Sequence, residues 1–433
     1  MLHRLFRLET FGIKLGLENI TLLCEALGHP ERSFTTLHVA GTNGKGSVTA
    51  IVHAALVASG LRAARYTSPH LLDITERFVV GESAVDVDEF EAVVHEVLDA
   101  ADHLRSTGVL SVLPTFFEAT TAIGFELFRR AGVEIAVVEV GLGGRFDATN
   151  VITPIAGAIT TIGFDHQEHL GRTLGAIAFE KAGIIKPDMP VVVGALGEEA
   201  MEVVARAAAE RGATLIDARG DLRVDVEMDD GRARVRIETA RASYGPVMLA
   251  LRGEHQVGNA LVAVGLLEAA MTRGVRVGTR AIEQGLASAV WPARLELLSL
   301  GSRRVLLDAA HNAEGAAALA AYLRRWHPER PALVIGIMRD KDVEQILTTL
   351  LPVVSRVTST AAPTRRALPA EELAACATTI AARVSPGLPV SCEPDPIRAV
   401  EMSLERSELV CVAGSIVLVG EVREHLVHRA ILQ

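Results

Sequence analysis

Cysteine and basic charge are scarce in this sequence. Its 433 residues include four cysteines, which are scattered with no CxxC pair and no zinc-type spacing, so we expect buried free thiols rather than disulfides. Lysine and arginine number 43 against 53 aspartates and glutamates, which gives a net charge of −10. A nucleic-acid surface needs a basic stripe, so we expect no nucleic-acid partner. An anionic ligand would have to bind in a pocket that is basic only locally.

Long hydrophobic runs are missing as well. No stretch approaches the ~18 apolar residues that a membrane-spanning helix needs, and residues 1–7 lack an apolar segment of signal-peptide length. We therefore expect a cytoplasmic protein with no membrane partner. What the chain does have is length and 49% hydrophobic residues, so two domains with sizeable cores are expected.

The most informative stretch is a glycine-rich turn between a strand and a helix. Residues 35–40 are β-branched and apolar and predict a buried strand, residues 41–47 are rich in glycine, and residues 48–58 have helical spacing. Such a turn cradles phosphate, because its backbone N–H groups and the helix N-terminus face the anion and Lys45 adds a charge. This context favours a nucleotide triphosphate as the ligand, and an ordinary glycine loop is the alternative.

The turn departs from the strict Walker pattern at two positions. Val39 stands where the first glycine belongs, and Gly46 separates Lys45 from Ser47. The departure points away from ordinary kinases and GTPases.

Polar side chains follow a second predicted strand at its carboxyl end, where open α/β sheets bind ligands. Ser68 and His70 come after residues 62–66, and Arg77 is close enough in sequence to reach an anionic substrate. The alternatives are a simple Ser-Pro turn and a surface ion pair between Glu76 and Arg77.

Glu139 lies near the end of another apolar strand, predicted over residues 134–140. A carboxylate there is costly to bury unless it is paired or binds a cation. A magnesium ligand beside a phosphate turn suits nucleotide-transfer chemistry, and an ion pair with Arg145 is the alternative.

Several other polar residues have ordinary structural explanations. Thr115 and Glu118 fit the capping box of a helix, which accounts for Glu118 without a catalytic role. Lys181 near a helix C-terminus complements the helix dipole. His166 and His169 lack a third zinc ligand, so hard-metal or phosphate chemistry fits them better.

Two further segments can be interpreted in two ways. Gly12 and Gly16 flank Lys14, which indicates either a shaped loop or a plain packing segment. Asn259 begins a long apolar helix and either hydrogen-bonds across a cleft or caps the helix.

The hydrophobic period indicates how the chain is divided. Residues 222–251 alternate with a period of two around an Asp-Asp-Gly turn, which predicts a small antiparallel sheet. Strand and helix alternate again after residue 296, the pattern of a second parallel α/β domain. We predict an α/β protein with an ATP-binding domain of mainly parallel sheet over 1–290, a linker at 291–296 and a Rossmann-like domain over 297–433.

Together these segments resemble the folylpolyglutamate synthase and dihydrofolate synthase family, within the wider group of ATP-dependent Mur ligases. The matching motifs follow the family order across nearly the whole chain. They are residues 13–20, 41–47, 66–71, 139–150, 165–166, 180–184, 259, 292–296, 308–312 and 340–342.

The resemblance implies a role for each of the matching site residues. The ATP-binding residues would be Thr42, Asn43, Gly44, Lys45, Gly46, Ser47, Asn259, Arg294, Asp308 and His311. The magnesium ligands would be Ser68, Glu139 and His166. The substrate-binding residues would be Lys14, Leu15, Gly16, Leu17, Arg77, Thr115, Phe146, Asp147, Ala148 and Thr149. The catalytic residues would be Lys45, His166 and Lys181, with Lys181 carbamylated.

The resemblance also implies the reaction and its partners. ATP would activate the carboxylate of a folate or dihydropteroate as an acyl phosphate, and the amine of L-glutamate would then attack it. Magnesium at two sites would assist, with a monovalent cation as a further candidate, and we expect a monomer. The nearest alternative is a Mur-type ligase of peptidoglycan precursors, and a nucleotide-dependent switch is the alternative from another class.

The chain departs from the family pattern at two alanines. Family members usually have glycine at the positions of Ala293 and Ala309. We expect an added methyl group in a tight turn to shift the hinge between the domains slightly.

Overall fold

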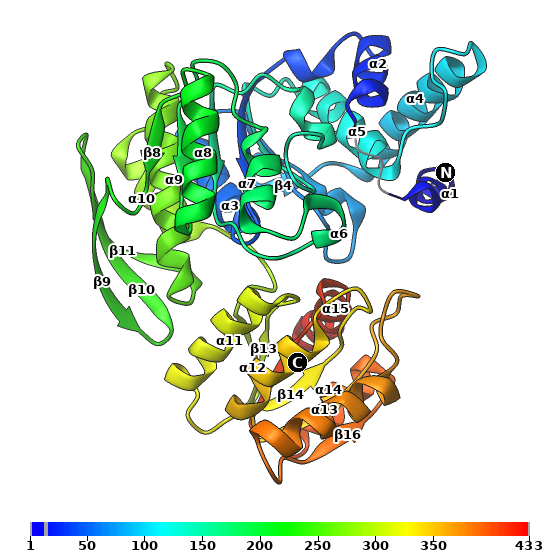
Figure 1. Ribbon diagram of the computed structural model, residues 1–433, viewed down its shortest axis with the longest axis vertical. Coiled ribbons are helices and arrows are strands. Elements are labelled where there is room, and N and C mark those ends of the chain that lie inside the picture. Colours follow the sequence, from blue (N-terminus) through cyan, green and yellow to red (C-terminus); the bar gives the residue numbers. More distant parts are fainter. Residues whose placement is uncertain (1, 13–15, 432–433) are drawn as a thin grey trace. The chain divides into compact units, whose positions relative to one another are not determined.

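The computed structural model describes residues 2–12 and 16–431, which form two compact units (Figure 1). The first unit contains the residues up to 226, 234–250 and 256–290. The second contains residues 227–233, 251–255 and those from 291 onward. Lys14 and Leu15, two of the predicted substrate residues, lie outside the described residues.

The first unit is built on an eight-stranded sheet with the strand order β4-β3-β2-β5-β1-β6-β7-β8. The strands from β2 to β8 in this order pair in parallel, and β3 and β4 are antiparallel additions at one edge. The bounds are β1 Thr35–Ala40, β2 Ala63–Tyr66, β3 Phe78–Val80, β4 Ser83–Ala84, β5 Ile135–Glu139, β6 Ala156–Ile159, β7 Val191–Val193 and β8 Leu215–Asp217.

Helices cover both faces of this sheet, which explains why nearly every residue of its central strands β1, β5 and β6 is buried. One face carries the apolar clusters of α2, α4 and α5 and of α7 and α8. The other carries α9, because Gly265 of α9 approaches Val192, which alternates with Val191 and Val193. The bounds are α1 Leu2–Arg7, α2 Glu18–Ala26, α3 Lys45–Ala58, α4 Val87–Ser106, α5 Phe116–Arg130, α6 Gln167–Leu170, α7 Leu174–Ala182, α8 Glu198–Glu210, α9 His255–Thr272 and α10 Thr279–Ser288.

A small three-stranded sheet follows α8, with the order β11-β10-β9. Its strands are β9 Arg223–Asp229, β10 Arg232–Glu238 and β11 Ser243–Arg252. Only Asp230 and Gly231 join β9 to β10, so these neighbours form a hairpin, as the sequence predicted. Alternate residues of β10 are buried, as expected for a sheet with one covered face.

The second unit has a six-stranded sheet with the order β12-β13-β17-β14-β15-β16. All its pairs are parallel except β12 with β13. The bounds are β12 Glu296–Leu300, β13 Arg303–Leu307, α11 Ala313–Trp326, β14 Ala332–Ile335, α12 Val343–Leu350, β15 Arg356–Ser359, α13 Ala370–Val384, β16 Val390–Cys392, α14 Pro396–Leu404, β17 Leu409–Ala413 and α15 Ile416–Ile431.

The predicted fold class is confirmed: a mainly parallel α/β sheet, a small antiparallel sheet and a separate α/β unit at the C-terminal end. The predicted strand 35–40 has the observed bounds of β1, and most other predicted elements agree within three residues. The elements not predicted are α1, α6, α8, α10, α14, β3, β4, β7, β8, β12 and β16, and most of them are short. Within the described residues, no helix combines the length and apolar character needed to cross a bilayer.

Candidate functional site

The glycine-rich turn of residues 41–47, the predicted phosphate turn, lies at the carboxyl end of β1, in the middle of the first sheet. It runs directly into α3, whose first residue is Lys45 and whose N-cap is Gly44. On one side of β1, Glu139 of β5 is paired in register with Val39; on the other side lies β6. The strand ends of β5, β1 and β6 therefore meet around the turn, which is where parallel sheets bind ligands.

The residues that follow β6 hold the turn in place. Thr160 Oγ1 donates to the carbonyl of Asn43 at 2.6 Å, and the Thr161 hydroxyl accepts from the Asn43 N–H at 3.1 Å. The Thr42 hydroxyl bonds both the N–H and the carbonyl of Gly163. A side chain at Gly41, where φ is 151°, would overlap the Thr160 hydroxyl, so this approach requires glycine.

Two lysines converge on a single carbonyl oxygen of the turn. Lys45 Nζ donates to the Gly41 carbonyl at 3.0 Å and to that of Thr42 at 3.2 Å. Lys181, which α7 supplies and which is only 4% exposed, donates to the same Gly41 carbonyl at 2.8 Å. Two ammonium groups and a helix N-terminus thus gather in one place, the locally basic pocket that an anionic ligand needs in an acidic protein.

Helix α9 supports the turn from its other end. A Cβ at Gly44, where φ is 86°, would overlap Oδ1 of Asn259. Nδ2 of Asn259 donates to Oε1 of Gln256 at 2.8 Å, and both side chains are buried. Gln256 therefore fixes which way the Asn259 amide points, with its oxygen toward the turn.

The predicted metal ligands Ser68 and Glu139 come together. Glu139 is 3% exposed, and its Oε2 lies 3.4 Å from the backbone nitrogen of Ser68. Burial lowers the pKa of Arg65, and the Glu139 charge opposes that shift. Arg145 is the alternative partner that the sequence offered for Glu139. Its Nη1 lies 3.9 Å from Oε1 of a different carboxylate, that of Glu180. A buried carboxylate beside the phosphate turn is the hard oxygen donor that magnesium prefers, so these residues fit such an ion.

His166 follows β6 in the left-handed region, with φ 50°, and its side chain is 41% exposed. Its backbone nitrogen donates to Asp165 Oδ1 at 2.9 Å, and its Nε2 lies 3.8 Å from the same carboxylate. Within the described ranges, no cluster of three or more His, Cys, Asp or Glu side chains could hold a metal ion. A shared site of His166 with Ser68 and Glu139 stays a prediction.

Arg77 is buried, so the alternative of a surface ion pair with Glu76 is wrong, and its predicted contact with substrate stays a prediction. Its exposed fraction is 6%, its Nε donates to His70 Nδ1 at 2.9 Å, and its guanidinium lies 5.3 Å from the centre of the Phe116 ring. Glu76 instead accepts from the N–H groups of Leu71 and Asp73. Burial, with help from the Arg77 charge, lowers the pKa of His70 to about 4, so this imidazole is neutral near pH 7.

Thr115 is the N-cap of α5, and the predicted capping box is confirmed. Its hydroxyl accepts from the Glu118 N–H at 3.2 Å, and Glu118 Oε2 accepts from the Thr115 N–H at 2.7 Å. Glu118 therefore has the structural role that the sequence indicated. Whether Thr115 also contacts substrate stays a prediction.

The predicted substrate residues Asp147, Ala148 and Thr149 have buried side chains. Asp147 accepts hydrogen bonds from the Leu142 N–H at 2.7 Å and from the hydroxyl of Thr149. Thr149 is joined in turn to His38 Nε2 at 2.9 Å. Burial raises the pKa of Asp147 to about 6. These contacts brace the loop after β5, and direct contact with substrate stays a prediction.

Phe146, the residue before Asp147, is half-buried. The Arg145 guanidinium lies 4.6 Å from the centre of the Phe146 ring and 5.2 Å from that of Phe179. Of the N-terminal substrate segment, Gly16 and Leu17 are described, and Leu17 is the N-cap of α2 and packs on its apolar cluster. Their roles toward substrate stay predictions.

The second unit brings Arg294 and Asp308 together. Asp308, 7% exposed, accepts from the backbone N–H groups of Leu295 at 2.8 Å and Ala310 at 2.9 Å. Burial raises the pKa of Asp308, and the Arg294 charge opposes the shift. Three residues after Asp308, His311 Nδ1 lies 2.8 Å from the Ala309 carbonyl oxygen and must donate to it. Their contribution to an ATP site stays a prediction.

The turn that carries Arg294 is strained. Ala293 and Leu295 have φ angles of 58° and 47°, in the left-handed region that favours glycine. Ala293 is one of the two positions at which the resemblance leads us to expect glycine, and its positive φ is the conformation that glycine adopts most readily. Ala309 is absent from the described positive-φ residues.

Three residues of the site were not predicted. The signal for Thr160 and Thr161 was a pair of hydroxyl residues in the apolar run that precedes Gly163. Which segment these hydroxyls contact depends on the order of the strands. Gln256 could have been found from its spacing, because it precedes Asn259 by three residues on the same helix and side chains at that spacing are neighbours.

Family models match most of the chain. The Mur ligase middle domain matches residues 91–267, and the glutamate ligase domain of Mur ligases matches residues 293–416. A curated relative, the dihydrofolate synthase/folylpolyglutamate synthase of Bacillus subtilis, is 32% identical over 421 residues, which cover 96% of each chain.

Solved structures agree with these matches. Folylpolyglutamate synthase of Mycobacterium tuberculosis complexed with ADP has a TM-score of 0.90 and 32% identity, with 98% of each chain covered. A bifunctional folylpolyglutamate synthase/dihydrofolate synthase with Mn, AMPPNP and L-glutamate bound has a TM-score of 0.83 and 28% identity, covering 98% of this chain and 97% of that one.

Proposed function

The chain belongs to the family of folylpolyglutamate and dihydrofolate synthases within the Mur ligases, and we propose that it joins the carboxylate of a folate or dihydropteroate to the amine of L-glutamate at the expense of ATP. Members of this family are ATP-dependent ligases. The peptidoglycan alternative has less support, because the similar proteins are folate enzymes.

One observation carries the proposal. Lys45 and Lys181 both donate to the Gly41 carbonyl at the N-terminus of α3, beside the buried carboxylate of Glu139. This arrangement supports binding of a triphosphate, because the Lys45 ammonium group and the free N–H groups of the helix start oppose its charge. It also supports a divalent ion at Glu139.

The reaction needs activation, since a carboxylate is a poor electrophile. The acceptor carboxylate attacks the γ-phosphorus of ATP, and ADP leaves with the electrons of the broken P–O bond. The amine of glutamate then attacks the carbonyl of the acyl phosphate, and phosphate leaves as the amide forms. In this scheme Lys45 opposes the charge that builds on the γ-phosphoryl oxygens.

Magnesium, when bound, would neutralise charge on the phosphate oxygens, with Ser68, Glu139 and His166 as its proposed ligands. Lys181, carbamylated in our proposal, would add a carboxylate-like group close to them. Asn259 is proposed to contact the nucleotide, with Gln256 orienting its amide.

Arg294, Asp308 and His311 are proposed to bind the nucleotide as well. We also propose the domain boundaries 1–290 and 297–433 with a linker at 291–296, in which Arg294 would lie. Closure of the site would exclude water from the acyl phosphate, which otherwise hydrolyses. A cytoplasmic location and a monomeric state remain part of the proposal.

The proposal is tested by following labelled glutamate into product with dihydropteroate or tetrahydrofolate as acceptor, together with ADP release. We expect ADP release to require both the acceptor and glutamate. ATP hydrolysis that is indifferent to both would contradict the proposal and favour a nucleotide-dependent switch.

Glu139→Gln provides the matched variant, because it keeps the shape of the side chain and removes its charge. We expect kcat to fall by about 100-fold or more, the range seen when charge stabilisation of a transition state is removed. Glu126→Gln is the control, since Glu126 is also buried but pairs with Arg129 and Arg130 on α5. The control should retain its kcat.

A further inference from the structure

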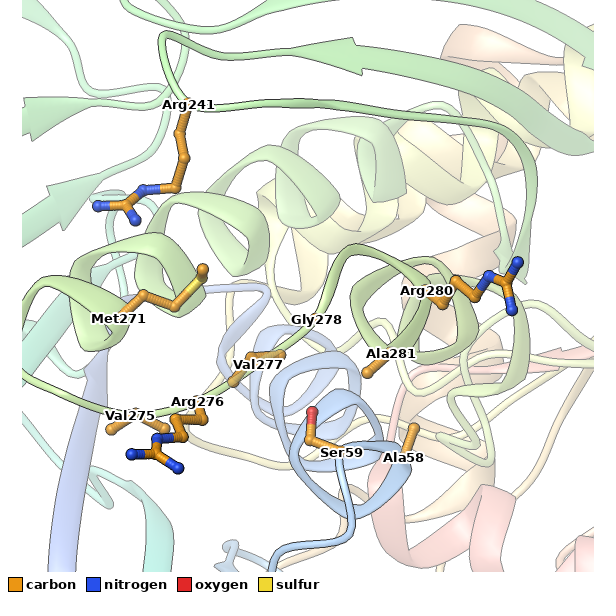
Figure 2. A pocket seen from close by; sticks show the side chains of 10 residues that line it. All are labelled: Ala58, Ser59, Arg241, Met271, Val275, Arg276, Val277, Gly278, Arg280 and Ala281. Carbon is orange, nitrogen blue, oxygen red and sulfur yellow. The ribbon is translucent and has the colours of Figure 1, made fainter.

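A second basic pocket lies in the first unit (Figure 2). Its volume is about 600 Å³, within the range of small-molecule sites. It is formed by the C-terminal end of α3, the end of α9, the segment that leads into α10 and the turn between β10 and β11. Its lining includes Ser59, Arg241, Met271, Val275, Arg276 and Arg280.

Three guanidinium groups and no carboxylate belong to this lining. Within residues 2–12 and 16–431, none of Arg241, Arg276 and Arg280 forms an ion pair. Glu268, on α9 close in sequence to the pocket residue Met271, accepts from the hydroxyls of Thr239 and Tyr244 instead. Such a concentration of unpaired positive charge is unusual in a chain with a net charge of −10.

The backbone adds to this positive field. Helix α10 begins beside the pocket at Thr279, and its N-cap Gly278, a lining residue, has no side chain to cap the helix. The first backbone bonds of this helix run from the N–H groups of Ala281 and Ile282 to the Gly278 carbonyl. The earlier N–H groups and the helix dipole therefore face an anion favourably.

Apart from Ser59 and Gly278, the remaining lining is apolar. Figure 2 shows Met271, on α9, between Arg241 and Arg276 in the view, with both guanidinium groups extending to the same side. Arg280 extends to the other side of the pocket in the same view. A ligand with acidic groups near its ends could use both sides while its carbon chain rests on Met271 and Val277.

The pocket is separate from the phosphate turn. Lys45 begins α3, whereas the pocket residues Ala58 and Ser59 are at its other end. The helix has 14 residues, so at 1.5 Å per residue its ends are about 20 Å apart. A ligand in the pocket therefore cannot be the triphosphate held by the turn.

We propose that this pocket binds a small polyanion that carries at least two phosphate or carboxylate groups. Guanidinium groups are the side chains best suited to both, because their fork of N–H donors matches the oxygens of either. The site does not depend on the proposed ligase activity, since it shares no residue with the phosphate turn.

Isothermal titration calorimetry on the full chain tests the proposal. The protein is first saturated with Mg-AMPPNP to occupy the phosphate turn, and inorganic pyrophosphate and tri-γ-glutamate are then titrated separately. We expect saturable binding of at least one probe, weakened by added salt. Binding of pyrophosphate alone would identify a phosphate ligand, and binding of tri-γ-glutamate alone would identify a carboxylate ligand.

Two double variants locate the binding. Arg241→Ala with Arg276→Ala should raise the dissociation constant by about tenfold or more, equivalent to about 1.4 kcal/mol. The matched control, Arg206→Ala with Arg236→Ala, removes two exposed arginines elsewhere in the same unit and should change it less than about twofold. Absence of saturable binding, binding unchanged in the pocket variant, or equal losses in both variants would each overturn the proposal. All the substituted arginines are exposed, so both variants should fold.

Discussion

The phosphate turn of the first unit and residues 293–295 of the second, the Arg294 turn, both contain positive φ angles. The two turns place these angles on different types of residue. In the phosphate turn, positive φ angles fall on glycines, 151° at Gly41 and 86° at Gly44. In the Arg294 turn they fall on Ala293 and Leu295, at 58° and 47°. The left-handed region costs a residue with a Cβ about 1–2 kcal/mol, so the second turn stores strain that the first avoids.

The difference lies in what occupies the backbone N–H groups. In the Arg294 turn they are taken by carboxylates of the same unit: Glu296 accepts from Ala293 at 2.8 Å, and Asp308 accepts from Leu295 at 2.8 Å. Glu296 is itself held by Arg423. A turn fixed from several sides can keep side chains in strained positions. In the phosphate turn, Thr161 accepts from the N–H groups of Thr42 and Asn43. Glycine is needed there because Thr160 and Asn259 lie too close to Gly41 and Gly44 for a side chain.

The largest effect is expected from Gly44→Ala, which gives the phosphate turn the side chain that the Arg294 turn tolerates. The new Cβ would meet Oδ1 of Asn259, so the turn or the amide must move. We expect the dissociation constant for Mg-AMPPNP, measured by calorimetry, to rise about 100-fold, or about 2.7 kcal/mol. Gly258→Ala is the control, because open space surrounds that glycine on α9. Equal affinity in the two variants would contradict this view of Gly44.

A smaller effect is expected from Asp308→Asn, which removes one anchor of the Arg294 turn. The new amide turns a donor toward one of the two N–H groups, so we expect a loss of about 1–3 kcal/mol in unfolding free energy. Because burial raises the native pKa of Asp308, the native state binds its proton more tightly than the unfolded state. The Asp308 carboxyl therefore makes its full contribution to the free energy of unfolding below the unfolded-state pKa of about 3.9. This contribution declines as pH rises toward the native-state pKa.

Urea denaturation of the wild type and of Asp308→Asn, at a series of pH values from below about 3.9 upward, measures the effect. The stability advantage of the wild type over Asp308→Asn should shrink as pH rises. An advantage that grows with pH would show that the native carboxylate is stabilised rather than penalised, and that the pKa is shifted downward.

The smallest effect is expected from Ala293→Gly, which makes the second turn resemble the first. Relief of about 1–2 kcal/mol of backbone strain outweighs the loss of one buried methyl group, about 0.8 kcal/mol. We therefore expect a net gain of up to about 1 kcal/mol and a higher melting temperature by calorimetry. Ala309→Gly, which removes a methyl group from a buried position outside the positive-φ set, should be destabilising. A gain in the second variant and not the first would refute the strain argument.

Local patterns predicted much of this molecule. Residues 35–40, the phosphate turn and the capping box of Thr115 depend on neighbours in sequence, and the structure has each where it was expected. The sequence also predicted a locally basic pocket for an anionic ligand, but this prediction followed from the net charge of −10 and not from spacing. Lys181 was the exception within that pocket, since its position suggested only an interaction with the helix dipole.

Contacts between distant strands could not be predicted in the same way. Thr160 and Thr161 matter only because β6 lies next to β1, and the order of strands is not visible in the period of either segment. Arg77 has the sequence of an exposed ion pair, yet it is buried against His70 and Phe116. Gln256 acquires its role through Asn259, and that role depends on where Gly44 lies in the fold.

The small sheet described earlier has a practical consequence for dissecting the protein. Residues 227–233 and 251–255 belong to the second compact unit although they precede its main body in the chain. Within that unit Gly231 approaches the Tyr322 ring, and Glu254 pairs with Arg325. Proteolysis or truncation at Trp291 would separate these short segments from the sheet and helices that they support. A stable C-terminal piece would have to regain them by fusion, or be studied in the intact polypeptide.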